Sequence, residues 1–535
     1  MKGRLLPVAS AALLALAFPP FQILLLPFVA LIPLAVALGS LKLTPGSGRK
    51  AALLGLTFGI CFWAIQLSWV PMVVGPQFPW AFPGYLAQVG ILAGLAALMA
   101  WSAHILHQAR GLPIALAFAL AWLAMEWVKT HFPLGLSFPW LGLGISLTSW
   151  PEFLGIAEWT GESGVSLWLA AVNGLGAASV LALTRGTRRI GFSASWVGLA
   201  LLALVFAAIP AAIGSGRART LDLRPGPRIA VVGTNVPRGL RLHPDRASAE
   251  GMAQALGHLG SLRPGEVELA VLPEATVTVP LDGPSGAPFR ASLVESAGRL
   301  ESSVLVGALG VPREFRSGAA GSLASNENSL LTNSAFLVDP SGRIVSRTDK
   351  VRMTPGMEWG GFTSGDPGMI HSTGSHPVGA LICYESLFGG LAGHLGRSGA
   401  TVLANLTSDV WFGSGERGPF SAFLRQHPAH LVMRAVETRT GVARAANGGF
   451  SFLLDPVGRT VSEIVPPTGG MTWSAVPVTG RTTFFTRFGD LLGPAAFMVS
   501  LILVGYSLLG ARRRTGTPDP GRPSNGSSGQ AHQPA

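Results

Sequence analysis

Long apolar stretches with few polar interruptions dominate the first 215 residues. Residues 51–100 contain no Asp, Glu, Lys or Arg. About 20 helical residues cross the hydrocarbon layer of a bilayer, and several stretches here reach that length. They lie near 51–73, 85–107, 112–129, 163–184 and 190–213. The pattern predicts a membrane-spanning helix for each of them.

Two further parts of the chain extend this prediction. Residues 5–38 are apolar but interrupted at Phe18-Pro19-Pro20-Phe21, which predicts two short spans joined by a tight turn. A cleaved signal peptide is the alternative, and the second apolar stretch that follows so closely argues against it. A last apolar stretch covers 488–511. We therefore expect a seven-helix transmembrane domain over 1–215 and a C-terminal transmembrane helix over 488–511.

Basic residues fall on alternate connections between these spans, and this pattern predicts the orientation of the chain. They are Lys2, Arg4, Lys42, Arg49, Lys50, Arg110, Arg185, Arg188 and Arg189, with Arg512, Arg513 and Arg514 after the last span. The positive-inside rule places such connections in the cytoplasm. Seven crossings then leave residue 215 on the outer face, and the last span returns the chain inside. The Gly-, Pro- and Ser-rich tail, 512–535, is predicted to be a disordered cytoplasmic segment.

Composition agrees with a membrane protein. Mean hydropathy is +0.44 and 12% of residues are charged, about half of the ~25% usual in soluble domains. The net charge of +12 arises largely beside apolar spans, which indicates membrane topology rather than nucleic-acid binding. We expect no metal site, and we interpret His427 and His430 as one face of a helix. A transporter is weakly supported, because Glu126 and Lys129 fall near the outer edge rather than at mid-depth.

The pattern changes between residues 220 and 485. Short β-like runs recur, and helical patterns near 247–262, 288–301 and 420–440 lie between some of them. The runs are Arg228–Thr234, Glu268–Leu272, Val304–Leu309, Ala335–Val338, Val378–Ile382, Thr401–Asn405 and Phe450–Leu454. Alternating strands and helices predict a layered α/β domain.

Chemically useful side chains follow three of these strands. Glu274 comes after a buried run and a proline, Lys350 ends the run Arg343–Lys350, and Cys383 ends an apolar strand. The other cysteine, Cys61, lies in a predicted span, so no disulfide is expected. A lone cysteine is more often a buried structural residue. With a carboxylate as base and an ammonium group to stabilise thiolate and oxyanion, Cys383 is instead a candidate nucleophile.

Glu274, Lys350 and Cys383, in this order, resemble the Glu-Lys-Cys triad of the nitrilase (carbon–nitrogen hydrolase) superfamily. A nitrilase-like domain between seven upstream spans and one downstream span resembles the apolipoprotein N-acyltransferase family. Further shared stretches are Lys350 with Pro355 and Glu358, Cys383-Tyr384-Glu385, Asp409-Val410-Trp411-Phe412-Gly413, Arg434 with Glu437, Asn447-Gly448, Arg487-Phe488-Gly489-Asp490, Ala17-Phe18-Pro19-Pro20-Phe21 and Phe138-Pro139-Trp140-Leu141. The chain departs from the family's usual residues at Leu242, Leu272 and Ser408.

The resemblance implies an α-β-β-α sandwich over 220–485 and an acyltransferase. Cys383 would take a fatty acyl chain from a membrane phospholipid, typically phosphatidylethanolamine, as a thioester. The α-amino group of the S-diacylglyceryl-cysteine of an apolipoprotein would then receive it, without cofactor or metal. The resemblance also implies a location in the bacterial inner membrane, with the catalytic domain on the periplasmic side.

Further site residues follow from the resemblance. Glu358 and Glu385 would orient Lys350 and the cleft, although each alternatively pairs with an arginine, and Tyr384 would support the active site. Trp411 and Phe412 would form a lid at the substrate entrance or, equally, be ordinary core aromatics.

Two rival functions are also compatible with the sequence. One is a membrane-tethered amidase or nitrile hydrolase with the same triad and water as acceptor. The other is a transporter or scaffold whose outer domain only binds.

Overall fold

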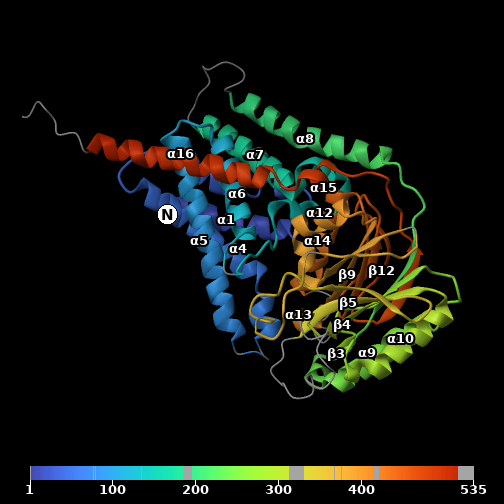
Figure 1. Ribbon diagram of the computed structural model, residues 1–535. Helices are drawn as coiled ribbons and strands as arrows, with labels where there is room; N and C mark the ends of the chain where they lie inside the picture. Colours follow the sequence, from blue (N-terminus) through green and yellow to red (C-terminus); the bar gives the residue numbers. More distant parts are fainter. Residues whose placement is uncertain are drawn as a thin grey trace, which may run out of the picture.

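The computed structural model has a helical half and a two-sheet half that pack side by side (Figure 1). Its described residues are 2–75, 78, 80–133, 135–184, 195–312, 331–358, 360–366, 368–374, 376–413 and 421–515.

Long apolar helices make up the first half. Their bounds are α1 (Lys2–Ala17), α2 (Leu26–Val29), α3 (Ile32–Ser40), α4 (Ser47–Gln66), α5 (Ala81–Gln108), α6 (Ile114–Thr130), α7 (Ala157–Thr184), α8 (Trp196–Thr220) and α16 (Leu492–Thr515). Among the described residues, five helical segments are long and apolar enough to cross a membrane, and two shorter apolar helices precede them. The five are Ser47–Val74, Ala81–Gln108, Pro151–Thr184, Trp196–Thr220 and Leu492–Leu509.

Local details of this half agree with the sequence in part. The chain turns at Phe18, whose carbonyl oxygen accepts bonds from the amides of Phe21 and Gln22 at 3.1 Å, so the two short helices form the expected hairpin. The helix expected over 190–213 instead occupies Trp196–Thr220, five residues beyond the expected domain boundary at 215. Arg185, Arg188 and Arg189 and the tail residues 516–535 lie outside the described residues.

Helix α7 is interrupted near its start, where it meets the second half. Gly161 has φ 66° and ψ −173°, a conformation that L side chains rarely adopt. The break leaves the amide of Glu162 without a helical partner, and this amide donates to Glu437 Oε1 at 2.7 Å. A Cβ at position 161 would lie 2.6 Å from the ring of Phe485, so close packing also requires glycine.

The second half contains two sheets. One has the order β13-β1-β2-β4-β5-β6, with β3 beside β4, and the other has the order β12-β11-β10-β9-β8-β7. The first comprises β1 (Arg228–Gly233), β2 (Leu269–Val271), β3 (Val277–Pro280), β4 (Ser303–Gly310), β5 (Thr332–Val338), β6 (Ile344–Asp349) and β13 (Gly470–Ala475). The second comprises β7 (Ile370–His371), β8 (Val378–Ile382), β9 (Val402–Ser408), β10 (Gly441–Asn447), β11 (Ser451–Leu454) and β12 (Thr460–Ile464).

The sheets face each other across a buried aliphatic layer that includes Val231, Val271 and Leu305 from one sheet and Val402 and Ala443 from the other. Helices α9 (Pro244–Leu259) and α10 (Ala287–Leu300) cover the outer face of the first sheet (Figure 1). Helices α12 (Gly389–Arg397) and α14 (Ala422–Thr438) cover the second. The α-β-β-α sandwich is therefore confirmed.

Helix α14 packs against α7, and one hydrophobic cluster runs from the membrane helices through α14 to the second sheet. The helical layer of the sandwich is thus also the junction between the two halves. Residues that follow β8 and β9 consequently lie close to the membrane helices.

Candidate active site

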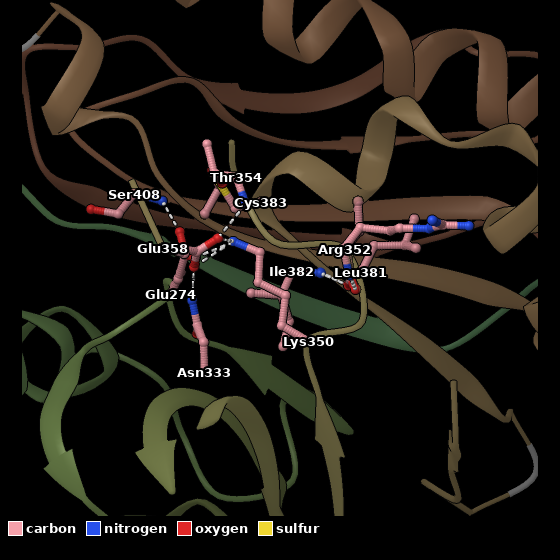
Figure 2. Close-up of polar contacts among 12 residues, drawn as sticks. Glu274, Asn333, Lys350, Arg352, Thr354, Glu358, Leu381, Ile382, Cys383 and Ser408 are labelled. Atoms are coloured by element: carbon pink, nitrogen blue, oxygen red, sulfur yellow. Dashed lines mark hydrogen bonds and ion pairs between the residues drawn. The ribbon is translucent and has the colours of Figure 1, made fainter. Parts of the chain in front are cut away.

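The three side chains singled out from the sequence come together between the two sheets. Glu274 follows β2, Lys350 follows β6, and Cys383 follows β8 of the opposite sheet. Their exposed fractions are 6%, 1% and 6%. Figure 2 shows the carboxylates of Glu274 and Glu358 converging on the Lys350 ammonium group beside Cys383. The sandwich therefore assembles an acid, an amine and a thiol from both of its sheets.

The ammonium group of Lys350 lies between two carboxylates. Its Nζ is 3.2 Å from Glu274 Oε1 and 2.9 Å from Glu358 Oε1. Burial lowers the pKa of Lys350, but the charges of Glu274 and Glu358 outweigh it and hold the pKa well above its usual value. Lys350 is therefore a permanent cation, available to stabilise negative charge that develops beside it.

Main-chain and amide donors fix both carboxylates. Asn333 Nδ2 donates to Glu274 Oε1 at 2.7 Å and to Glu358 Oε1 at 3.0 Å. The amide of Ser408 donates to Glu274 Oε2 at 2.9 Å, and that of Thr354 donates to Glu358 Oε2 at 2.6 Å. Each carboxylate thus keeps one orientation toward Lys350, as catalysis by pre-positioned groups requires. The role predicted for Glu358, orienting Lys350, fits this geometry.

Cys383 has a left-handed backbone with φ 52°, at the point where β8 enters the 3₁₀ turn η7 (Cys383–Leu387). Such a conformation costs a non-glycine residue roughly 1–3 kcal/mol. Burial raises the pKa of the thiol and the Glu274 charge raises it further, while Lys350 and a hydrogen bond with Thr407 oppose them. The resting group is a thiol, so its attack requires a base to take the proton, and Glu274 is the nearby carboxylate.

The two residues after Cys383 have different partners. Glu385 accepts from the amides of Ile382 (2.7 Å) and Val351 (2.6 Å), and it ties the nucleophile turn to the segment that follows Lys350. Tyr384 donates from its hydroxyl to the carbonyl oxygen of Ser137 at 2.9 Å. Ser137 lies in the connection between α6 and α7. Among the described residues, Glu385 forms no ion pair with an arginine, and its contacts with main-chain amides favour the role of orienting the cleft.

The aromatic pair lies at the junction between the halves, on the short helix α13 (Val410–Gly413). Phe412 stacks on Phe423 with ring centroids 4.3 Å apart and meets the edge of Trp69 at 5.6 Å. Trp411 lies 6.4 Å from Phe78. Both rings therefore contact membrane-half aromatics, and whether they also move as a lid stays a prediction.

Sequence reasoning missed a buried polar group behind the nucleophile. His427 and His430 lie on α14, in agreement with their interpretation as one helix face, and both are fully buried. His427 contacts Asp409 and the carbonyl oxygen of Cys383, and Arg444 pairs with Asp409. A polar face on the predicted 420–440 helix was the available signal. Within the described part of the chain, no cluster of His, Cys, Asp or Glu is suited to a metal ion.

Comparisons with known proteins match both halves of the chain. The apolipoprotein N-acyltransferase N-terminal domain matches residues 10–175, and the carbon-nitrogen hydrolase family matches residues 228–476. The second match covers the whole of the two-sheet half and all three candidate catalytic residues.

Curated relatives align along nearly the full chain. The apolipoprotein N-acyltransferase of Geobacter metallireducens is 27% identical over 517 residues, which cover 91% of this chain and 92% of that protein. The apolipoprotein N-acyltransferase of Pseudomonas aeruginosa is 28% identical over 534 residues, covering 96% and 98%. That of Brucella melitensis is 29% identical over 559 residues, covering 94% and 95%.

Among solved structures, a double mutant of the amidase from Nesterenkonia sp. AN1 in complex with acrylamide is similar at 18% identity, with a TM-score of 0.36. The match covers 48% of this chain and 91% of the amidase. With its N-terminal helical half, its hydrolase-like sandwich and relatives that match it almost end to end, the chain belongs to the apolipoprotein N-acyltransferase family.

Proposed function

We propose that this chain transfers a fatty acyl chain from a membrane phospholipid to the α-amino group of the N-terminal S-diacylglyceryl-cysteine of apolipoproteins, through a thioester on Cys383. The observation that carries the proposal is the convergence of Glu274, Lys350 and Cys383 beside the junction with the membrane helices. Family membership supplies the reaction class and both substrate classes, a phospholipid donor and an apolipoprotein acceptor.

In the first half-reaction, the Cys383 sulfur attacks the carbonyl carbon of an acyl ester. The S–C bond forms as Glu274 takes the thiol proton, and Lys350 stabilises the negative oxygen of the tetrahedral intermediate. The ester C–O bond then breaks, and the proton passes from Glu274 to the departing lysophospholipid alcohol. The products are a lysophospholipid and the acyl-enzyme.

In the second half-reaction, the α-amino nitrogen of the apolipoprotein attacks the thioester. The C–N bond forms and the C–S bond breaks, while Glu274 takes a proton from nitrogen and returns it to the Cys383 sulfur. An amide is more stable than a thioester, so no further energy source is needed. Water must be excluded in the interval between the two steps, and Phe412, packed against Trp69, is placed to help.

The finer features of the proposal concern donor and placement. We assign phosphatidylethanolamine as the preferred donor and the bacterial inner membrane as the location, with the sandwich on the periplasmic side. The alternating basic connections support this orientation. The contact between Tyr384 and Ser137 supports a cleft at the membrane surface, where both lipid-anchored substrates lie.

Mass spectrometry of the purified protein after exposure to phosphatidylethanolamine tests the proposal. We expect one acyl chain on the peptide that contains Cys383, removed by hydroxylamine and absent from Cys383→Ala. Cys61→Ala removes the only other cysteine and should acylate normally. Adding a diacylglyceryl-peptide with a free amino terminus should discharge the acyl group as an amide.

Two outcomes would contradict the proposal. One is a wild-type protein that never acquires an acyl group under these conditions. The other is discharge to water alone in the presence of the acceptor peptide, which is the behaviour of a membrane-tethered amidase. Protease accessibility of the sandwich in sealed, oriented vesicles checks the side of the membrane separately.

A further inference from the structure

The end of strand β9 touches the catalytic groups through three consecutive residues. Thr407 lowers the pKa of the neighbouring Cys383 thiol, and its hydroxyl donates to Asp409 Oδ1 at 3.0 Å. The amide of Ser408 donates to Glu274 Oε2 at 2.9 Å. Asp409, the next residue, begins the connection to α13. Asp409 lies in a stretch that the family shares, but the resemblance gives its side chain no role.

The Asp409 carboxylate is fully buried and held by charged partners. Arg444 Nη2 donates to Asp409 Oδ2 at 2.6 Å, and His427 Nδ1 lies 3.1 Å from Asp409 Oδ1. The exposed fractions of the three residues are 0% to 1%. Burial raises the pKa of Asp409, but Arg444 and His427 outweigh it and lower the pKa to about 2. Asp409 is therefore a carboxylate at any working pH.

His427 connects this carboxylate to the nucleophile. Its Nε2 lies 3.3 Å from the carbonyl oxygen of Cys383 and 3.2 Å from Ser386 Oγ. That carbonyl oxygen accepts from Ser386 Oγ at 3.0 Å and from Asn405 Nδ2 at 3.4 Å. Arg444 Nη1 in turn donates to Asn405 Oδ1 at 2.5 Å. Because Cys383 has a left-handed backbone, a fixed carbonyl oxygen opposes its relaxation to an ordinary conformation.

Asp409 also precedes the short helix α13, which carries Trp411 and Phe412. The carbonyl oxygen of Asp409 accepts from the amide of Phe412 at 2.9 Å, so the side chain and the main chain of Asp409 hold different parts of the site. The side chain acts toward Cys383, and the main chain acts toward α13 with Trp411 and Phe412.

We propose that Asp409 is a positioning residue. Through Arg444 with Asn405, and through His427 with Ser386, it holds the carbonyl oxygen of Cys383. Through its neighbour Ser408 it keeps the Glu274 carboxylate in line, so that nucleophile and base face each other correctly. This role of Asp409 rests on the proposed acyl transfer by Cys383. A purely electrostatic role for Asp409 is the competing explanation. The two roles predict opposite changes in the rate of Cys383 acylation when the charge of Asp409 is removed.

Asp409→Asn separates them, because it keeps the volume and removes the charge. We measure acylation of Cys383 by phosphatidylethanolamine and by p-nitrophenyl butyrate, and alkylation of the thiol by iodoacetamide. A misplaced nucleophile slows acylation by about 10²-fold. Alkylation proceeds through the thiolate fraction present at equilibrium and needs no alignment with an ester carbonyl. It stays equal or becomes faster, because loss of the carboxylate lowers the pKa of the thiol.

A second pair of variants tests the link through His427. His427→Gln keeps a polar side chain between Asp409 and the turn of Cys383 and Ser386, whereas His427→Ala does not. We expect acylation rates in the order wild type, Gln, Ala, with similar alkylation rates in all three. The matched control is Asp455→Asn, which removes another buried carboxylate that accepts from the amides of Val457 and Arg459, and it should acylate normally.

Three results would overturn the inference: Asp409→Asn acylates within threefold of wild type, it acylates faster in step with alkylation, or both rates fall together as the folded fraction falls. Its failure is distinguishable from failure of the proposed function. If wild type reacts with p-nitrophenyl butyrate but not with phospholipid, the acyl donor was misassigned and the positioning test still stands on the activated ester.

Discussion

The hydroxyl of Tyr384 donates to the carbonyl oxygen of Ser137 at 2.9 Å and so links the residue after the nucleophile to the membrane half. Removing the hydroxyl in Tyr384→Phe takes this donor away from the part-buried carbonyl oxygen of Ser137, at a cost of about 0.5–1.5 kcal/mol. We expect slower acylation of Cys383 by phospholipid, by about tenfold, with acylation by a small soluble ester less affected.

The control for this variant is Tyr85→Phe. Tyr85 also donates to a main-chain oxygen, that of Ala64 at 3.1 Å, but within the helical half alone. Comparable losses in the two variants, measured by single-turnover acylation, would show that the Tyr384 contact has no special connection with catalysis.

Replacing the cation of the site should abolish the reaction and weaken the fold. Lys350→Met leaves Glu274 and Glu358 facing each other without their shared ammonium group. Removing one partner of a buried pair typically costs about 3–5 kcal/mol, and losing one stabilising donor costs about 10²–10³ in rate. Thermal unfolding and single-turnover acylation measure the two effects.

Lys129→Met provides the comparison for Lys350→Met. Lys129 is also buried, and its Nζ donates to the carbonyl oxygen of Trp140 at 2.7 Å. This variant should lose stability while each folded molecule still acylates. Acylation by Lys350→Met at the wild-type rate would remove Lys350 from the mechanism.

The aromatic contact at the junction should affect the fate of the thioester more than its formation. In Phe412→Ala, the contacts with Trp69 and Phe423 are lost and water gains access to the acyl-enzyme. We expect a larger share of free fatty acid relative to amide product, measured by chromatography of the released lipids. Phe412→Leu keeps most of the apolar volume, so its product ratio should fall between those of wild type and Phe412→Ala. An unchanged product ratio in Phe412→Ala would rule out a barrier to water at this residue.

Stability should depend on pH through His371, which is fully buried on β7 and contacts the hydroxyls of Ser346 and Thr348. Burial lowers its pKa from 6.5 to about 4. The unfolded chain therefore binds a proton between pH 6.5 and 4 that the folded chain does not, and stability falls as the pH falls through this window. The largest loss in the free energy of unfolding is roughly 3 kcal/mol, because each unit of pKa difference between the folded and unfolded chain contributes about 1.4 kcal/mol.

Thermal unfolding at pH 7 and pH 5 checks this sign. His371→Gln should flatten the dependence, and His376→Gln, at a half-buried histidine nearby, should leave it unchanged. An equally steep dependence in His371→Gln would assign the effect to other groups.

Much of this architecture was predictable, for identifiable reasons. The runs that became β1, β4 and β8 are buried and apolar, and a polar residue marks the end of β8 at Cys383. Strand β10 was missed, because Gly441–Asn447 consists mainly of small residues around a fully buried Arg444. A buried arginine has no distinctive sequence pattern, since its partners Asp409 and Asn405 are 35 and 39 residues away.

The site shows the same division. Glu274, Lys350 and Cys383 follow strands and could be found one by one, whereas His427 became meaningful only once α14 was placed against β9. The helix patterns gave α14 within two residues at either end, but which of its faces is buried depends on the membrane helices that it contacts. Contacts between the halves are the part that local patterns do not contain.

The interruption of α7 at Gly161 has a consequence for how relatives can be recombined. The amide of Glu162 is satisfied by Glu437 of the sandwich, and Glu162 Oε2 accepts from Arg434 at 2.7 Å. A chimera that joined the helical half of one homologue to the sandwich of another would therefore need to inherit glycine, both glutamates and the arginine as one set. The two halves are consequently not freely interchangeable at this contact, even though each matches a family model of its own.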